Sequence, residues 1–534
     1  MAIGFIIGYL AVLLIVGFLA KRRAQPGHED FFLASRRLGP LVLLVTLAAT
    51  NFSSFTIFGF AGAGYRFGYA YYPIMAFGTG FMALTFILLG IPARKAAVAA
   101  GAITPAELIY HRFRNRPLYL VYLLVMVIFT LPYLALQPLG AGYMLNVLLG
   151  IPYQAGAALV VVTGLVYVLL AGLRGDAWTD LVQGLIMLVG IILIFLALVT
   201  TLGGFVRIST GLNQSLPVLF SRPGGADFFT PKIWFSYLVL WFLCDPMFPQ
   251  LFQRFLAARD EQALNSAAVF YPLITGLLFF FPVAIGVLAH TVFLSLEGAK
   301  TDQVLPMMVN KLLSPFFAGV MSLCGIAALM STMDSQLLTL SSMVIRDIRL
   351  LLKRPPETRG VIQVLVIALL ALLGLLLALK PLGTILEIAT ETFTGLAVLF
   401  PTTIFAAYWG KTNPWACLGS IIIGELLVVL YHLKLLPGFG FLPVIPITVF
   451  TMLFVVIGSF IFPATGLKAW AEINSHRSGR LIIFLLVFIL ANDFWNWQRP
   501  SPLFLGLPLW LWYHFGLIAV LFVFNLFWIG KKNT

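Results

Sequence analysis

Long apolar blocks alternate with short polar connections along the whole chain, and this pattern predicts the elements. A helix crosses the hydrocarbon core of a bilayer with roughly 20 apolar residues, and most blocks reach that length. Spanning strands would show short alternating segments, so we expect helices, which satisfy their backbone groups within one segment. The blocks predict about fifteen spans, near residues 2–20, 39–64, 70–91, 117–137, 153–173, 178–202, 233–252, 267–295, 315–342, 361–379, 384–409, 412–431, 441–462, 481–498 and 503–529.

Composition supports an all-α polytopic membrane protein with the lipid bilayer as its surroundings. Of the 534 residues, 61% are hydrophobic and 10% are charged, which excludes a soluble domain. The formal net charge is +14, but 24 of the 33 Lys and Arg residues fall in connections on one side if the N-terminus is outside. This asymmetry predicts an outside N-terminus and a cytoplasmic C-terminus, and nucleic acid is not expected as a partner. Lys21, Arg22 and Arg23 follow the first block, so it is predicted to be an uncleaved span, not a signal peptide.

A dense polar run, from Ser331 to Gln336, interrupts the apolar block at 315–342. Polar residues at membrane depth are costly, and they usually mark an ion or substrate path inside a bundle. Ser331 and Thr332 offer adjacent hydroxyl oxygens, the hard ligands that an alkali cation prefers. The alternative is that both hydroxyls bond back to the preceding helical turn. The run makes a transporter the leading hypothesis.

Two predicted spans carry interruptions, at residues 49–54 and 244–250, and the second contains two prolines. Non-helical backbone is tolerated at this depth only where it lines a cavity or is buried in protein. The interrupted spans each begin a block of five spans, and such blocks are inserted with opposite orientation, as in inverted-repeat transporters. The predicted organisation is an extra helix and loop (1–38), the first repeat (39–202), an outside loop (203–232), the second repeat (233–409), additional helices (410–480) and a two-helix unit (481–534).

Enzymatic chemistry is not indicated by the polar residues. The six histidines are scattered and form no metal-binding or Ser/His/Asp grouping, which disfavours the alternative of a membrane-embedded transferase. The three cysteines have no paired or metal-ligand spacing. We expect no enzyme activity and no cofactor.

Five stretches occur in the order typical of one family: residues 29–36, 49–65, 171–184, 253–258 and 328–347. On these motifs the chain resembles the sodium:solute symporter family, which includes sodium-coupled sugar, proline, pantothenate and monocarboxylate carriers. The resemblance implies a leucine-transporter-like core of five plus five helices, formed by the second to eleventh spans. It also implies a small-molecule substrate, sodium as the coupling ion and, for a bacterial-type cell, the inner membrane.

The family's sodium site is carried over residue by residue. The resemblance implies that the carbonyls of Ala49, Phe52 and Ala328 and the hydroxyls of Ser331 and Thr332 bind sodium. Protons remain an alternative coupling ion.

One further carboxylate, Asp180, matches a conserved position near the family's sodium path. The alternative is a carboxylate at a helix start, stabilised by the helix dipole. Arg174 and Asp176 are predicted to pair with each other at a helix end.

The substrate site matches less well. Thr56, Met75 and Gly78 stand where the sugar carriers have their ligands, so a sugar is not expected. Broken-helix N-termini favour anionic groups, and we expect a small organic acid, monocarboxylate-like or pantothenate-like. Asp245 could instead attract an amine or cation, which leaves proline or another zwitterion as the alternative. The expected cavity residues are Asn51, Ser54, Phe55, Thr56, Tyr133, Gln137, Trp241, Asp245, Phe248 and Gln250.

The last two spans, within 481–529, resemble small two-helix membrane proteins sometimes encoded beside monocarboxylate-type symporters. The alternative is two further helices typical of the family. Trp495, Trp497, Trp510 and Trp512 are predicted to lie in belts at the membrane interface.

Overall fold

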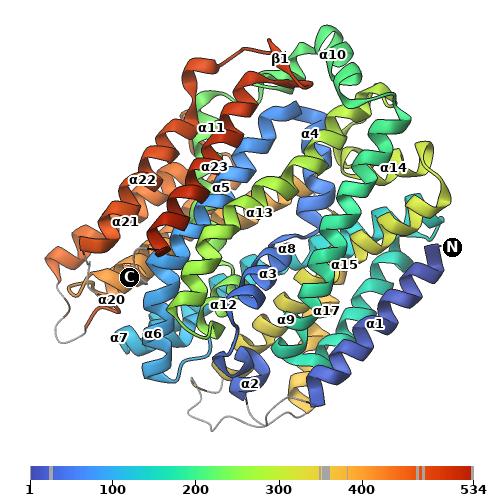
Figure 1. The fold of residues 1–534 in the computed structure, drawn as a ribbon. Coiled ribbons are helices and arrows are strands. Elements are labelled where there is room, and N and C mark those ends of the chain that lie inside the picture. Colours follow the sequence, from blue (N-terminus) through green and yellow to red (C-terminus); the bar gives the residue numbers. More distant parts are fainter. Residues whose placement is uncertain are drawn as a thin grey trace.

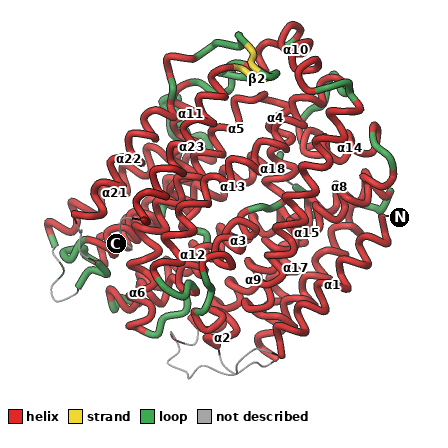
Figure 2. The backbone as a smooth tube through the Cα atoms, viewed as in Figure 1, coloured by secondary structure: helices red, strands yellow, loops and turns green. Residues whose placement is uncertain are grey.

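The computed structural model of the protein describes residues 2–22, 28–347, 350, 361–381, 383–462, 464, 468–471 and 475–530. This part of the chain is almost entirely helical, with one short antiparallel hairpin near α10 (Figure 2). The first half contains α1 (Ala2–Arg22), α2 (His28–Leu33), α3 (Pro40–Asn51), α4 (Phe60–Phe67), α5 (Tyr71–Thr85), α6 (Ile91–Ala100), α7 (Pro105–Phe113), α8 (Arg116–Leu149), α9 (Tyr153–Thr201) and α10 (Phe205–Ser215). The second half contains α11 (Pro231–Cys244), α12 (Pro249–Ala257), α13 (Glu261–Leu288), α14 (Val304–Leu312), α15 (Pro315–Ser342), α17 (Val361–Ala378), α18 (Ile385–Ala397), α19 (Leu399–Tyr408), α20 (Pro414–His432), α21 (Val444–Ile461), α22 (Ser475–Asn492), β1 (Leu503–Phe504), β2 (Leu507–Pro508) and α23 (Leu509–Gly530).

Eleven helices in the described residues are long and apolar enough to cross a membrane, or twelve with the bent pair α11–α12. Three shorter apolar helices cover Ile3–Leu19, Pro40–Asn51 and Leu481–Asn496. The expected count of about fifteen spans is therefore not confirmed. One reason is that the predicted span 39–64 is divided: α3 ends at Asn51, and the rest falls in one candidate span, Phe55–Ala100, which includes α4, α5 and α6.

Both predicted interruptions are present. Helix α3 starts with a proline in its first turn and ends before Phe52, whose backbone is extended (φ −86°, ψ 94°). Helix α11 ends at Cys244, and α12 begins at Pro249 after a change of direction of 56°. Pro246 and Pro249 lack the N–H that a continuing helix would need, so the break follows from the sequence.

The interrupted helices lie inside a tight bundle (Figure 1). Helix α15 packs along α8 and α9 and also contacts α3 and α12, while α13 packs against α3, α4 and α5. Helix α9 is kinked at Gly172, which has a left-handed φ of 61°. A Cβ atom there would lie 2.7 Å from the Phe31 ring, so α2 is seated against the kink. The kink thus separates the two halves of α9, and the second half faces α3 and α15.

The C-terminal helices α22 and α23 pack on α5, α11 and α13 at one side of the bundle (Figure 1). A buried arginine, Arg222, joins them to the loop before α11. Its guanidinium lies 5.0, 4.7 and 4.8 Å from the rings of Trp234, Trp497 and Trp510, and donates to Asp493 Oδ2 at 2.9 Å. Burial lowers the pKa of Arg222 to about 10, so it stays cationic at neutral pH. The predicted interfacial belt is wrong for Trp510, which is only 3% exposed because it packs on this cation.

Candidate ion and substrate site

The polar run on α15 meets the end of α3. Thr332 Oγ1 donates to the carbonyl oxygens of Thr50 and Phe52, at 2.9 and 3.3 Å. These carbonyls lie at the point where the helix stops, so the break exposes them to the side chain of another helix. Ala49 and Ala328, the other two expected carbonyl donors, are fully buried on the same two helices. The structure therefore brings the two separated parts of the expected sodium site together.

Ser331 faces α9 instead. Its hydroxyl donates to Asp180 Oδ1 at 2.5 Å. The other oxygen of Asp180 accepts from Thr46 Oγ1 on α3 and, at 3.2 Å, from Arg254 Nη2 on α12. Asp180 thus links α3, α9, α12 and α15 next to the expected sodium ligands. All four side chains are fully buried.

Arg254 is shared between two carboxylates. Its Nη2 donates to Asp176 Oδ2 at 2.8 Å and to Ser335 Oγ at 2.6 Å, and Ser335 Oγ lies 2.9 Å from the same Asp176 oxygen. The predicted pair between Arg174 and Asp176 is wrong, because Arg174 reaches back to Asp30 on α2. Both residues follow the kink at Gly172; beyond it Asp176 is fully buried inside the bundle, whereas Arg174 contacts α2. Arg254, Asp176 and Ser335 were missed as site residues, although a buried arginine within the membrane needs carboxylate partners.

The polar residues of the expected substrate cavity gather around the same breaks. Asn51 Nδ2 donates to Tyr271 OH at 2.9 Å, and Thr56 Oγ1 donates to the Asn51 carbonyl at 3.1 Å. The backbone N–H of Ser54 donates to Gln137 Oε1 at 3.0 Å, so α8 closes over the end of α3.

Tyr133 is held by a hydroxyl of the same break. Its OH donates to Ser53 Oγ at 3.3 Å. The carboxyl of Asp245, across the break in α11, lies against the side chains of Asn51, Thr79 and Cys244. Both interrupted helices thus contribute polar groups to one interior region.

An aromatic cluster borders these polar groups. The ring centroids of Phe55 and Trp241 are 5.4 Å apart, and those of Tyr133 and Phe248 are 5.0 Å apart. Phe393, on α18, joins both pairs, since its centroid lies 4.7–5.8 Å from all four rings. Phe393 is not among the expected cavity residues, because an aromatic residue in an apolar span carries no distinguishing signal.

Several buried polar atoms in this region have no hydrogen-bond partner among the described residues: Ser54 Oγ, Trp241 Nε1, Asp245 Oδ2, Gln250 Nε2 and Gln250 Oε1. Unsatisfied buried polar groups cost free energy, and each requires an explanation. Such atoms also occur elsewhere in the described residues, and those at the two breaks are available to pair with a polar ligand. The ten expected cavity residues are all less than a tenth exposed.

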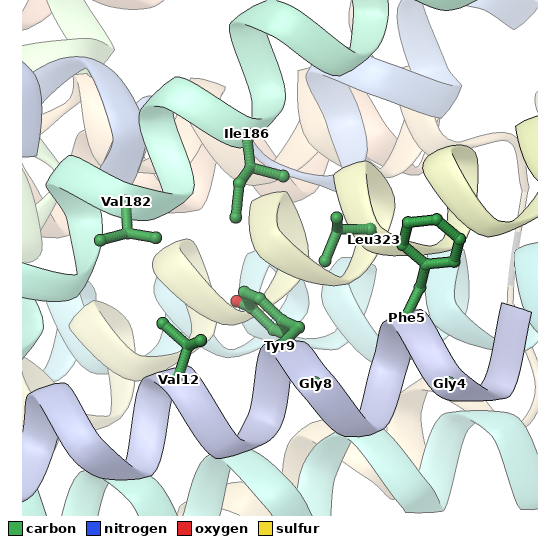
Figure 3. Close-up of a pocket in the computed structure, with 8 residues that line it drawn as sticks. All are labelled: Gly4, Phe5, Gly8, Tyr9, Val12, Val182, Ile186 and Leu323. Carbon is green, nitrogen blue, oxygen red and sulfur yellow. The ribbon is translucent and has the colours of Figure 1, made fainter.

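An apolar groove of about 580 Å³ lies elsewhere, between α1, α9 and α15 (Figure 3). Phe5, Tyr9, Val182 and Leu323 are among its lining residues. The Tyr9 hydroxyl accepts from Gln183 Nε2 on α9 at 2.8 Å. This groove offers almost no oxygen ligands, so it is not a candidate ion site.

One end of the bundle is closed around Asp302, in the segment before α14. Asp302 Oδ2 accepts from the N–H of Ile385 at the start of α18, at 2.8 Å. Arg66, at the end of α4, donates to Thr384 Oγ1 at 3.3 Å. Burial raises the pKa of Asp302 from 3.8 to about 7. These bonds tie α4, the segment before α14 and α18 together.

The fold and the site are those of a multi-pass membrane transporter, in which broken helices surround an oxygen-rich interior site. The model of the sodium:solute symporter family matches residues 31–424. The chain belongs to the sodium:solute symporter family, and it is accordingly a sodium-coupled symporter of a small organic solute.

Its relatives agree with this assignment. The sodium/pantothenate symporter of Escherichia coli K12 is 27% identical over 464 residues, covering 85% of this chain and 95% of its own. The osmoregulated proline transporter OpuE of Bacillus subtilis 168 is 27% identical over 467 residues, covering 85% and 93%.

Solved structures show the leucine-transporter-like fold. A Na⁺-coupled sialic acid symporter in a substrate-bound, outward-open state matches with a TM-score of 0.72 at 19% identity, covering 87% of this chain and 99% of its own. MhsT in complex with L-phenylalanine matches with a TM-score of 0.53 at 16% identity, covering 80% and 98%. The expected fold class is confirmed.

Proposed function

We propose that sodium binds between α3 and α15, to the carbonyls of Ala49, Phe52 and Ala328 and the hydroxyls of Ser331 and Thr332. The observation that carries this proposal is the contact of the Thr332 hydroxyl with two carbonyl oxygens at the α3 break. A hydroxyl that already lies against carbonyl oxygens needs little movement to share a monovalent cation with them. Five neutral oxygens suit a hard, singly charged ion.

Asp180 serves the same ion in this proposal. Its carboxylate accepts from Ser331, so it holds one of the proposed ligands and adds negative charge beside the site. Asp176 and Asp180 face a single cation, Arg254, which leaves one negative charge uncompensated when both are ionised. A sodium ion leaving the site toward α9 would meet this charge.

The substrate is proposed to be a small organic acid, of the monocarboxylate or pantothenate kind. The unpartnered indole N–H of Trp241 and amide of Gln250 could donate to a carboxylate, and the pantothenate symporters are relatives along most of their length. The second candidate is a zwitterion such as proline. The free Asp245 oxygen favours it, because a carboxylate repels an anion and attracts an ammonium group.

Transport is proposed to proceed by alternating access. The repeats 39–202 and 233–409 each begin with a broken helix, and rocking of one helix group against the other would expose the central site to each side in turn. We place the N-terminus outside, the C-terminus in the cytoplasm and the protein in the inner membrane of a bacterial-type cell.

Uptake by proteoliposomes tests this function. The purified protein would be offered labelled organic acids, pantothenate and proline, each with an inward gradient of sodium or of choline. Uptake that requires the sodium gradient, for at least one acid, is expected. If proline is the only compound taken up, the substrate is a zwitterion and not an organic acid. Equal uptake with the sodium and choline gradients would refute sodium coupling.

A further inference from the structure

A second cavity, of about 470 Å³, lies away from the transport site, between α6, α7 and residues 468–471. Its lining is basic: it includes Lys95, His111, Arg112, Arg114, Lys468 and Trp470. None of the described residues that line it is acidic. All of these residues fall in connections that the charge asymmetry places on the cytoplasmic side.

Arg112 is the buried base of this cavity, with 4% of its surface exposed. Its Nε and Nη2 atoms donate to the carbonyls of Ala406 and Trp409, both at 3.2 Å, so α19 fixes the guanidinium. Its Nη1 atom is buried and has no hydrogen-bond partner among the described residues. A buried cationic donor without a partner is costly, and an anion in the cavity would supply the missing acceptor.

The charges around Arg112 leave the cavity positive. Lys95 is paired with Glu261, at 2.7 Å, and both side chains are about half exposed. Burial and the neighbouring Arg114 lower the pKa of His111, so it is mostly neutral at neutral pH. Arg112, Arg114 and Lys468 form no salt bridge with a described residue. Three cations therefore converge on one cavity without a described carboxylate.

We propose that this cavity binds a phosphate-bearing anion, supplied by the headgroup of an anionic phospholipid. Guanidinium groups match phosphate geometry with paired N–H donors. The cavity lies where α6 ends and where the chain continues beyond α21, which are positions at the membrane surface. Basic pockets between helices at this depth bind anionic headgroups. A bound headgroup would join α6, α7 and the 468–471 segment, so it would couple the lipid composition to the packing of this end of the bundle.

The test compares two sources of phosphate on the purified full-length protein. The thermal unfolding midpoint would be measured in phosphatidylcholine nanodiscs, in nanodiscs with one third phosphatidylglycerol, and in phosphatidylcholine nanodiscs with added inorganic phosphate. The main variant, Arg114→Gln with Lys468→Gln, removes two exposed charges and leaves the bonds of Arg112 intact. The matched control, Arg22→Gln with Arg37→Gln, removes two exposed charges on the same predicted side but outside the cavity. Arg112→Gln is a third variant.

Phosphatidylglycerol is expected to stabilise the wild type and the control, and native mass spectrometry should show binding about fivefold weaker for each charge removed from the cavity. If inorganic phosphate stabilises the wild type but not the cavity variant, the cavity is an anion site and its ligand is a free anion, not a lipid headgroup. In that case the lipid part of the proposal is overturned. Equal stabilisation of the wild type, the cavity variant and the control by phosphatidylglycerol would overturn the proposal. If Arg112→Gln does not fold, the comparison of the two double variants still decides.

Discussion

Replacing Thr332 by alanine is the most direct perturbation of the proposed sodium site. In the structure its hydroxyl bonds two carbonyls, at 2.9 and 3.3 Å, and sodium would replace those bonds. A contact with a charged group contributes about 1.5–3 kcal/mol, and the neutral bond that it replaces contributes about 1 kcal/mol. The difference is about 0.5–2 kcal/mol, so the sodium concentration for half-saturation should rise roughly two- to thirtyfold.

Sodium-dependent thermal stabilisation measures this change without knowledge of the substrate, because a ligand that binds only the native state raises the unfolding midpoint. Thr332→Ser keeps the hydroxyl and should stay close to the wild type. Ser341→Ala is a matched control, since that buried hydroxyl on α15 donates to the Leu338 carbonyl of its own helix. Unchanged sodium affinity in both Thr332→Ala and Ser331→Ala would refute the assigned ligands.

Three further predictions concern other buried charges. The pKa of Asp302 is raised to about 7, so the native state holds this proton more tightly than the unfolded state does. The free energy of unfolding should therefore fall as pH rises from about 4 to 7, by roughly 4 kcal/mol at most. Asp302→Asn should flatten the pH dependence of the thermal midpoint, and an unchanged slope would contradict this. Asp245→Asn should change substrate affinity, ion coupling or the pH profile of uptake, and if all three stay as in the wild type, Asp245 is structural. Arg222→Gln leaves Asp493 buried without its cation and should cost about 3–5 kcal/mol of stability; adding Asp493→Asn should restore part of the loss, whereas an equal or greater loss in the double variant would count against the ion pair.

The helical bundle and both breaks could be predicted because each depends on local sequence. Apolar length predicts a spanning helix, and the prolines at 246 and 249 remove donors that a continuous helix requires. The number of spans was less accessible, since hydropathy cannot tell that Phe52 ends one helix in the middle of a predicted span.

The hydrogen-bond network around Arg254 could not be predicted from the sequence. Asp176 and Arg174 are neighbours in the chain, and a helix-end pair was the simplest expectation. The left-handed φ of Gly172 turns the chain, so that Asp176 meets an arginine 78 positions away. Phe393 illustrates a second limit: its central position among four rings depends on the packing of α18 and not on any local pattern.

Arg222 joins the C-terminal pair α22–α23 to the core through one salt bridge and three indole rings. Because both partners belong to one polypeptide, their docking is intramolecular and its effective concentration does not depend on expression level. Dilution in the bilayer cannot separate them, and every transporter carries one copy of the pair. If α22–α23 were a separate protein, this contact would require equal expression of two subunits; in a single polypeptide the two parts are always present in equal amounts.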